Sequence, residues 1–172
     1  MDQAEIDAFW RDTQIRGRLN PAGAYLGRSV DEALPPPAWS FGSDAQEADE
    51  LLGLVLDGIK TATSSARHEY DEDGEDLPTP GMLAILMDGA EHPRALIRTT
   101  AVEVVRFDAV SAEHAWAEGE GDRSLAHWRR EHTAFFGGPN GTVPPSMLVV
   151  CERFVVLASG PRRSRSGVRQ DA

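Results

Sequence analysis

The sequence has one cysteine, one lysine, two tyrosines and no long apolar run among its 172 residues. The single cysteine, Cys151, excludes a disulfide within the chain, so a cytoplasmic location is the expectation. Cys151 lies in the apolar run MLVVCERFVVL, where a small buried side chain is expected. No apolar stretch approaches the roughly 20 residues of a membrane helix. The acidic start MDQAEIDAFW also lacks the basic and apolar parts of a secretion signal, so we expect no membrane partner.

Positive charge is scarce and unevenly placed. The net charge is −11, and the last fourteen residues carry four arginines and one aspartate, which leaves −14 on the rest. A body this acidic repels a long polyanion, because phosphate neutralisation supplies most nonspecific nucleic-acid affinity. Binding to nucleic acid would need a local basic groove or the Arg-rich tail at 158–172, and we expect that tail to be a solvated, disordered end.

The length and the 41% hydrophobic content predict one globular domain. The segment IDAFWRDTQI predicts a helix with Ile6 and Trp10 on its apolar face. A proline-rich segment of little periodicity follows and is typical of an extended wrap. We therefore expect residues 1–37 to pack against a domain that spans 38–157.

The rest of the chain predicts alternating helices and strands. A helix capped by Ser43 and ended by Gly58 is predicted for the segment SDAQEADELLGLVLDG. An exposed acidic loop is predicted for the segment HEYDEDGEDLPTPG. MLAILMD and RALIRTTAVEVVRF predict strands joined as a hairpin by GAEHP, and MLVVCERFVVL predicts the last strand. Between them lie two helices, one beginning at Ser111 and one capped by Asp122 or Ser124. This order predicts an α+β fold whose mixed or antiparallel sheet curls into a small β-barrel.

Several kinds of site are not indicated. The sequence has no CxxC pair, no HExxH and no glycine-rich phosphate loop of the Walker or Rossmann form. His127 and His132 share a predicted helix but lie five residues apart, so they do not face one metal ion. We expect no metal and no cofactor.

The only lysine, Lys60, stands in DGIKTATSS. Sixteen arginines can reflect genomic base composition, but that tendency does not explain the exception. Arginine is always charged, whereas lysine is compact and can release a proton. A site that needs such an amine, or a narrow channel, would retain lysine. The alternative is that Lys60 survived by chance on the surface.

Thr63 follows three residues after Lys60. In a regular strand, such residues point to opposite faces, so the two converge only if the chain still turns after Gly58 or contains a bulge. The alternative is a half-buried strand of small residues. If they converge, an amine beside a hydroxyl can activate a nucleophile.

The segment EGEGDRS, residues 118–124, is the second candidate site. Glu118 lies at a predicted helix C-terminus, where the dipole is expected to raise its pKa into an acid/base range. Asp122 begins the next helix, where capping alone explains it. The two glycines indicate a tight backbone path. Trp116 and Trp128 could stack a base, although both are more often core residues, and a solvated acidic loop is the overall alternative.

Arg98 shares a predicted strand face with Leu96 and Val102. This apolar company predicts that Arg98 points inward, where it could hold a carbonyl or an anion. The alternative is a strand arginine that extends to water, as Arg94 on the same face could.

These segments together resemble the ASCH domain. The resemblance covers about residues 38–157 and rests on the segments GIKTAT, LPTPG, MLAILMD, IRTTAVEVVRFDAV and AWAEGEGDRSLAHWRREHTAFF. Within the family, the sequence resembles most specifically the small bacterial single-domain ASCH proteins. It implies a PUA-like small β-barrel with flanking helices, and PUA relatives bind RNA. Some small bacterial ASCH proteins are amidohydrolases that deacylate N4-acetylcytidine through a Lys, a Thr three residues on and a Glu. Another has been described as a ribonuclease.

Carried onto this sequence, the resemblance implies a catalytic set of Lys60, Thr63 and either Glu118 or Glu120. The residues expected to bind the substrate are Arg98, Thr61, Asp122, Ser124 and Trp128. The first hypothesis is an amidohydrolase acting on an N-acylated nucleoside or a similar small amide. The alternatives are an RNA- or nucleotide-binding module without catalysis, and a ribonuclease. The partner is then a nucleoside or RNA, and a homodimer is compatible with the sequence.

Overall fold

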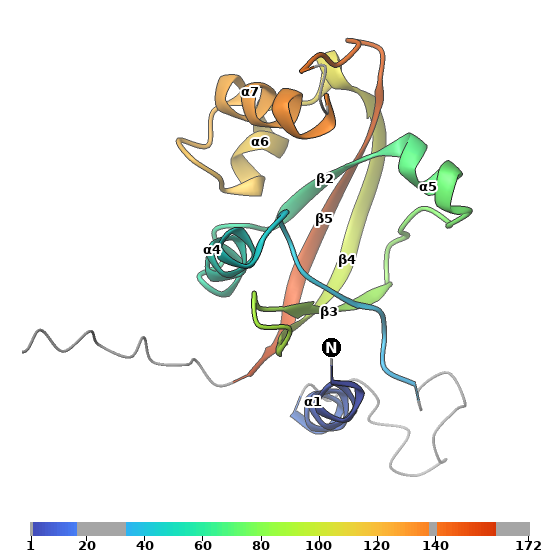
Figure 1. Cartoon of the computed structure of the whole chain (residues 1–172), viewed down its shortest axis with the longest axis vertical. Helices are drawn as coiled ribbons and strands as arrows, with labels where there is room; N and C mark the ends of the chain where they lie inside the picture. The colour runs from blue at the N-terminus through green and yellow to red at the C-terminus, as the bar shows by residue number, and fades with distance from the viewer. Residues whose placement is uncertain (1, 17–33, 138–140, 161–172) are drawn as a thin grey trace, which may run out of the picture.

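Two long antiparallel strands form the spine of the molecule in a computed structural model that describes residues 2–16, 34–137 and 141–160 (Figure 1). They belong to a five-stranded sheet of order β1-β3-β4-β5-β2, in which only the β1–β3 pair is parallel. The strands are β1 (Ala38–Trp39), β2 (Ala62–Ala66), β3 (Leu83–Met87), β4 (Pro93–Arg106) and β5 (Leu148–Ser159). The α+β class and the mixed sheet are confirmed. Within the described residues the sheet is curled but open, because the edge strands β1 and β2 do not pair with one another.

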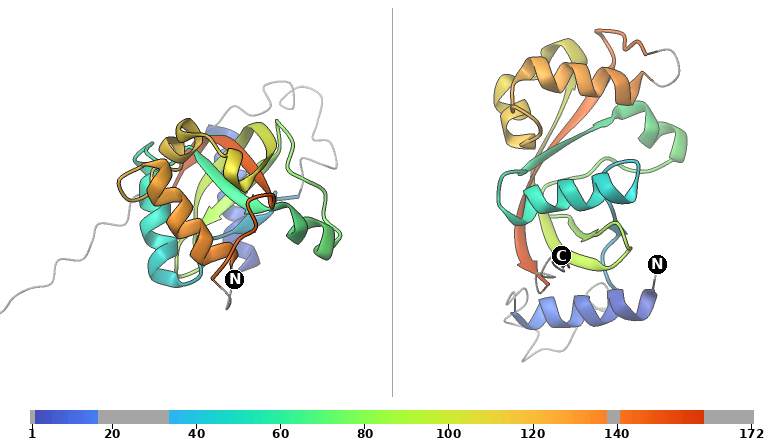
Figure 2. Two further views of the ribbon diagram at one scale, coloured as in Figure 1. Left: turned by 90° about the horizontal axis from the view of Figure 1, so that it is seen from above. Right: turned by 60° about the vertical axis from the view of Figure 1, so that its left-hand side comes forward.

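The helices lie around this sheet rather than in one layer (Figure 2). They are α1 (Gln3–Arg16), α4 (Ala45–Leu56), α5 (Arg67–Asp73), the 3₁₀ helix η1 (Phe107–Ala109), α6 (Ala112–Glu118) and α7 (Leu125–Phe136). Helices α6 and α7 cover the end of the sheet opposite to α1, and α4 lies between these two ends (Figures 1 and 2). No described helix combines the length and the apolar character needed to cross a membrane.

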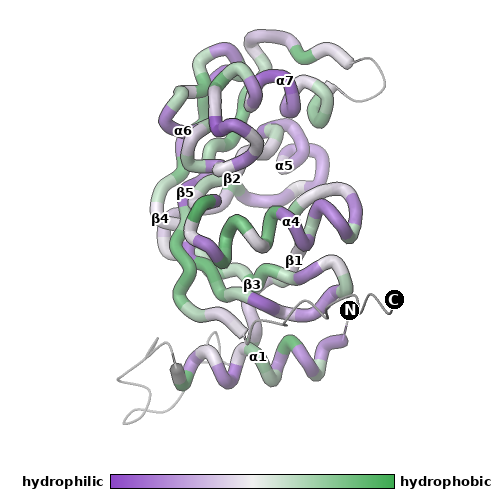
Figure 3. Tube along the Cα trace, turned by 90° about the vertical axis from the view of Figure 1, so that its left-hand side faces the viewer, coloured by the Kyte–Doolittle hydropathy of each residue, from purple (hydrophilic) through white to green (hydrophobic). Residues whose placement is uncertain are grey.

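Helices α4 and α7 bury their apolar faces on different stretches of β5. Leu52 and Val55 of α4 pack with Phe154 of β5, and Trp128 of α7 packs with Val149 at the other end of the same strand. In the tube of Figure 3, α4 is hydrophilic in its first half and hydrophobic in its second, the strands beside it are largely hydrophobic, and α5 is hydrophilic. The core is therefore divided among the helices, which leaves room for a cleft between α4 and α7.

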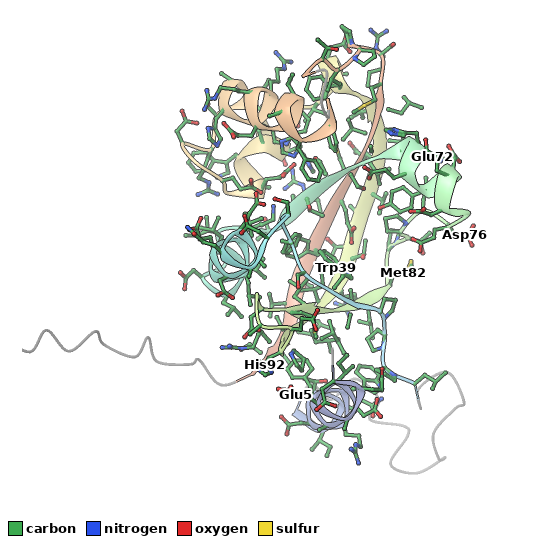
Figure 4. The ribbon with its side chains drawn as sticks, viewed as in Figure 1. Glu5, Trp39, Glu72, Asp76, Met82 and His92 are labelled. Atoms are coloured by element: carbon green, nitrogen blue, oxygen red, sulfur yellow. The ribbon has the colours of Figure 1, made fainter. Side chains whose placement is uncertain are left out.

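Helix α1 closes the end of the sheet farthest from α7. Ile6 and Trp10 are buried against Leu96, which confirms the predicted apolar face of this helix. The Nδ1 of His92 lies 2.8 Å from a carboxylate oxygen of Glu5, so the β3–β4 turn is also tied to the helix (Figure 4). The backbone N–H of Gly160, the last described residue, donates to the carbonyl of Arg94 at 2.8 Å. Both ends of the described chain therefore lie at this end of the molecule.

Two local predictions are corrected. The cap of α4 is Asp44, whose side chain accepts from the backbone N–H of Glu47, while Glu47 accepts from Ser43, the predicted cap. Part of the predicted acidic loop is helix α5, which ends at Gly74 in the left-handed conformation. The predicted wrap at residues 17–33 and most of the predicted tail, residues 161–172, lie outside the described residues.

Candidate functional site

The chain is still turning when it reaches Lys60. Gly58 adopts a φ of 71°, and the backbone N–H groups of Ile59 and Lys60 both donate to the carbonyl of Leu54, at 2.9 and 3.0 Å. Strand β2 begins only at Ala62. The chain therefore turns just before Lys60, and Lys60 and Thr63 both line one cleft.

This cleft has a volume of about 840 Å³. It falls within the range of roughly 300–1,000 Å³ that is typical of small-molecule sites. Three successive residues of the edge strand β2 line the cleft, and the aromatic wall comes from β1, α5, α7 and the segment before α4. The β2 residues and the aromatic residues that line it are Thr63, Ser64, Ser65, Trp39, Phe41, Tyr70 and Phe135.

Lys60 lies at the centre of the polar part of the cleft. Its side chain is only 1% exposed, so chance survival on the surface does not explain this lysine. Its Nζ lies 2.6 Å from Oε1 of Glu120, 3.6 Å from Oε2 of Glu118 and 5.0 Å from the ring centroid of Phe41. The carboxylate of the last residue of α6 and that of a residue in the loop after it therefore meet one ammonium group from the turn that follows α4.

Glu118 is fixed by donors from three elements. Its Oε1 accepts from the hydroxyl of Ser64 at 2.5 Å and from the indole N–H of Trp128 at 2.6 Å, and the Nε2 of His114 lies 3.0 Å away. Its Oε2 lies 3.5 Å from the Nε2 of His132. With 2% of its side chain exposed, Glu118 ties β2, α6 and α7 together and has little capacity left for a ligand.

The sequence argument about the pKa of Glu118 is corrected. Burial acts to raise this pKa, but hydrogen bonds from His114 and His132 and the positive charge of Lys60 outweigh it and hold the pKa well below its usual range. The predicted rise considered only the dipole of α6 and not the donors that the fold brings from elsewhere.

Glu118 is therefore expected to make the free energy of unfolding depend on pH. A carboxyl whose folded pKa lies below its unfolded value contributes stability above the unfolded pKa, near 4.5, and loses it as the pH falls through the folded pKa. Glu118→Gln should remove this dependence. It should also lower the free energy of unfolding at pH 7 by about 3 kcal/mol, because the buried Lys60 loses a partner.

Urea denaturation across acidic and neutral pH measures both effects. Glu103→Gln, a neutralised glutamate on the exposed part of β4, is the matched control and should change the free energy of unfolding by about 0.5 kcal/mol or less. An unchanged acid dependence in Glu118→Gln would contradict the assignment.

Glu120 differs from Glu118 in access. Its side chain is 29% exposed, and Lys60 is the only side chain among the described residues with which it forms an ion pair. One carboxylate oxygen therefore remains open toward the cleft. Of the two glutamates that the sequence left as alternatives, Glu120 is the one with free capacity for a reacting group.

The two glycines between the acidic residues have the tight path that was expected. Gly119 adopts a φ of 78°, and a Cβ atom there would lie 2.7 Å from the carbonyl oxygen of Ile59. The backbone N–H of Thr61 donates to the carbonyl of Ala117 at 2.7 Å. The end of α6 is thus held directly against the chain on either side of Lys60, which places Glu120 within reach of the amine.

None of the five residues predicted to bind the substrate lines this cleft. Arg98 is exposed on β4, so the predicted inward orientation of its side chain is wrong. On this face of the strand, helix α1 covers the region around Leu96 but does not extend over Arg98. Thr61 lines a second cavity of about 540 Å³, which includes none of Lys60, Glu118 and Glu120. Its backbone N–H and carbonyl groups form hydrogen bonds with Ala117 of α6 and Phe154 of β5, so Thr61 links these two elements.

The other three residues have structural contacts. Asp122 is exposed and accepts from the backbone N–H of Ser124, and Ser124 caps α7. Trp128 is 3% exposed and stacks on His132 with ring centroids 4.1 Å apart, so it holds Glu118 rather than a base. Trp116 does not line the cleft and is covered by the guanidinium of Arg123 at 3.8 Å.

The sequence argument missed Glu152 of β5, which also lines the cleft. Burial raises the pKa of Glu152, and a hydrogen bond from Thr99, at 2.6 Å, only partly opposes this. One signal was available, since Glu152 interrupts the apolar run that forms β5. The neighbouring Cys151 is buried, and burial together with the negative charge of Glu118 raises its pKa to about 12, which leaves an unreactive thiol.

Comparisons with known proteins agree with this fold. The family model of the ASCH domain matches residues 37–158. The structure is similar to that of a protein from Enterococcus faecalis V583 assigned to the DUF984 family, with a TM-score of 0.75 and 32% identity, over 92% of this chain and 90% of that one. It is also similar to an ASCH domain from Lactobacillus crispatus JV V101, with a TM-score of 0.73 and 28% identity, over 90% of this chain and 94% of that one. No curated protein shows a significant match to the sequence. The match to the ASCH model and the likeness to both structures cover most of the chain, and the chain therefore belongs to the ASCH domain family.

Proposed function

We propose that this protein is an amidohydrolase that removes the acyl group from an N-acylated nucleoside, or from a similar small amide, through Lys60, Thr63 and Glu120. The observation that carries the proposal is the buried Lys60, whose Nζ lies 2.6 Å from the accessible carboxylate of Glu120 in the cleft that Thr63 also lines. An amine, a carboxylate and a hydroxyl in one cleft are the groups that acyl transfer to a threonine requires.

The pair of Lys60 and Glu120 can make the amine available without a change in net charge. Transfer of one proton from Nζ to Oε1 leaves a neutral amine beside a neutral carboxyl group. The amine then takes the hydroxyl proton of Thr63 while the hydroxyl oxygen attacks the acyl carbon. Glu118, whose donors hold it as an anion, keeps Lys60 in place during this exchange.

The charge of the cleft favours an uncharged substrate. Seven glutamates line it, against one lysine and no arginine among the described residues. Such a surface repels phosphate groups, so it fits a nucleoside better than a nucleotide or an RNA strand. The aromatic side chains, Trp39 and Tyr70 among them, provide faces on which a base can stack.

The direct test is incubation of the purified protein with N4-acetylcytidine. We expect release of cytidine and acetate, which chromatography can monitor. The rate of this release should depend little on salt concentration between low and physiological ionic strength. The same protein is expected to leave a fluorescent single-stranded RNA uncut. Tight RNA binding that weakens steeply with salt, without release of acetate, would contradict the proposal and favour the RNA-binding alternative.

A further inference from the structure

Glu152 lies directly opposite Thr63 in the sheet. The antiparallel register of β2 and β5 pairs the Cα atoms of these two residues. Directly opposed residues of an antiparallel pair share one face of the sheet, with Cβ atoms about 5 Å apart. Both side chains line the cleft. A substrate whose acyl carbon is in reach of Thr63 therefore has its neighbouring atoms beside the carboxyl group of Glu152.

One oxygen of the Glu152 carboxyl group forms a hydrogen bond within the protein, and the other does not. Oε1 accepts from the hydroxyl of Thr99 at 2.6 Å. Thr99 is buried and lies on β4 at a point where its register with β5 shifts, between Thr99 and Ala101. No other hydrogen bond or ion pair to the side chain of Glu152 forms within the described part of the chain. Its second oxygen is free to contact a ligand.

The surroundings of Glu152 favour its protonated form, in contrast to those of Glu118. Burial raises the pKa of Glu152, and the hydroxyl of Thr99 is the only group that opposes the rise. The titratable group that faces it from α5 is Tyr70, whose own pKa is raised, chiefly by burial. Two cleft carboxyl groups whose pKa values are shifted in opposite directions are typical of sites that divide acid and base roles between them.

Hydrolysis of an amide needs a proton at the leaving nitrogen, and none of Lys60, Thr63 and Glu120 has been assigned that step. We infer that Glu152 is the general acid that protonates the leaving amine, an inference that rests on the proposed function. Its position opposite Thr63, its open oxygen and its place in the cleft wall carry this assignment.

The proton and electron balance closes with these four residues. The hydroxyl oxygen of Thr63 bonds to the acyl carbon, its proton goes to the amine of Lys60, the C–N bond breaks, and Glu152 gives its proton to the nitrogen. In the second half, a water molecule attacks the threonine ester. Its proton returns to Glu152, the ammonium of Lys60 returns a proton to Thr63, and Glu120 gives its proton back to Lys60.

The test compares two substrates that differ in their need for an acid. Glu152→Gln should lower kcat for N4-acetylcytidine by about 100-fold or more, which is the usual contribution of a general acid. For 4-nitrophenyl acetate, whose leaving group departs without a proton, the rate of first-turnover release of 4-nitrophenol should change by no more than about threefold, because Glu152 takes part in that reaction only in the later hydrolysis of the threonine ester. The kcat of the wild type for the amide should also fall at alkaline pH as Glu152 loses its proton, and the variant should lack this fall. Glu103→Gln, which neutralises an exposed strand glutamate outside the cleft, is the control.

The outcomes separate the two claims. An equal loss for amide and ester, or no loss for either, would overturn the role of Glu152 and leave the proposed function standing. If the wild type hydrolyses the amide but not the ester, the pH dependence of kcat for the amide decides on the role of Glu152. A fall of kcat at alkaline pH that persists in Glu152→Gln would then overturn the inference. A wild type that hydrolyses neither substrate would overturn the proposed function and, with it, this inference.

Discussion

Lys60→Arg is expected to lower kcat/KM for N4-acetylcytidine by at least about 1,000-fold, because arginine keeps its proton at every accessible pH. The buried position also has little room for a planar guanidinium, since the side chain of Lys60 is 1% exposed and lies between Glu120 and the ring of Phe41. Steady-state kinetics with chromatographic detection of cytidine measures the effect. Circular dichroism and thermal denaturation show whether the variant is folded.

The reverse substitution on the surface supplies the control. Arg98→Lys changes the same pair of residue types at an exposed position of β4 and should leave kcat/KM unchanged. If Lys60→Arg fails to fold, Lys60→Ala with added methylamine replaces it, because a small amine can enter the vacated space and restore turnover. Full activity of a folded Lys60→Arg variant would refute the proposed chemistry.

Thr63→Val is expected to have an effect of the same size, because it removes the attacking oxygen and keeps the shape of the side chain. We expect kcat to fall by at least about 1,000-fold. The dissociation constant for N4-acetylcytidine should change by only a few-fold. No hydrogen bond from the hydroxyl of Thr63 to another group is recorded among the described residues, so its loss leaves no buried partner without a bond.

Thr61→Val is the matched control for this variant. Thr61 lies two residues earlier, and its hydroxyl makes one long hydrogen bond of 3.4 Å to the carbonyl of Ala117 outside the cleft. Mass spectrometry of the wild type mixed with a slow substrate should detect an acetyl group on the peptide that contains Thr63, and Thr63→Val should lack it. Equal losses in the two valine variants would mean that β2 is merely disturbed.

Local signals in the sequence were enough for most of the fold. The face of α1 that includes Ile6 and Trp10 follows from helical spacing, and the cap at Ser111 follows from residue type, because both depend on neighbours in the chain. Helix α5 escaped prediction because its acidic composition indicated a loop. An ion pair between Arg67 and Asp71, four residues apart, supports this helix of about two turns instead.

Features of the site could be predicted only where they depend on residues close together in the sequence. The turn at Gly58 could be stated as a condition. A tight backbone path at Gly119 was implied by the glycine itself, whereas its neighbour, Ile59, was not. The position of Glu152 opposite Thr63 depends on the register of strands almost ninety residues apart, which no local pattern contains. The low pKa of Glu118 likewise depends on donors from distant elements.

The shared location of the two ends of the described chain has a practical consequence. Helix α1 and Gly160 both lie beside the β3–β4 hairpin, and neither contributes to the lining of the cleft. A linker joined directly to either end of the described residues, next to α1 or at Gly160, would therefore start from the side of the molecule that α1 covers. Protein immobilised on a sensor chip through such a linker is expected to present an unobstructed cleft, so nucleoside binding can be recorded on the captured protein.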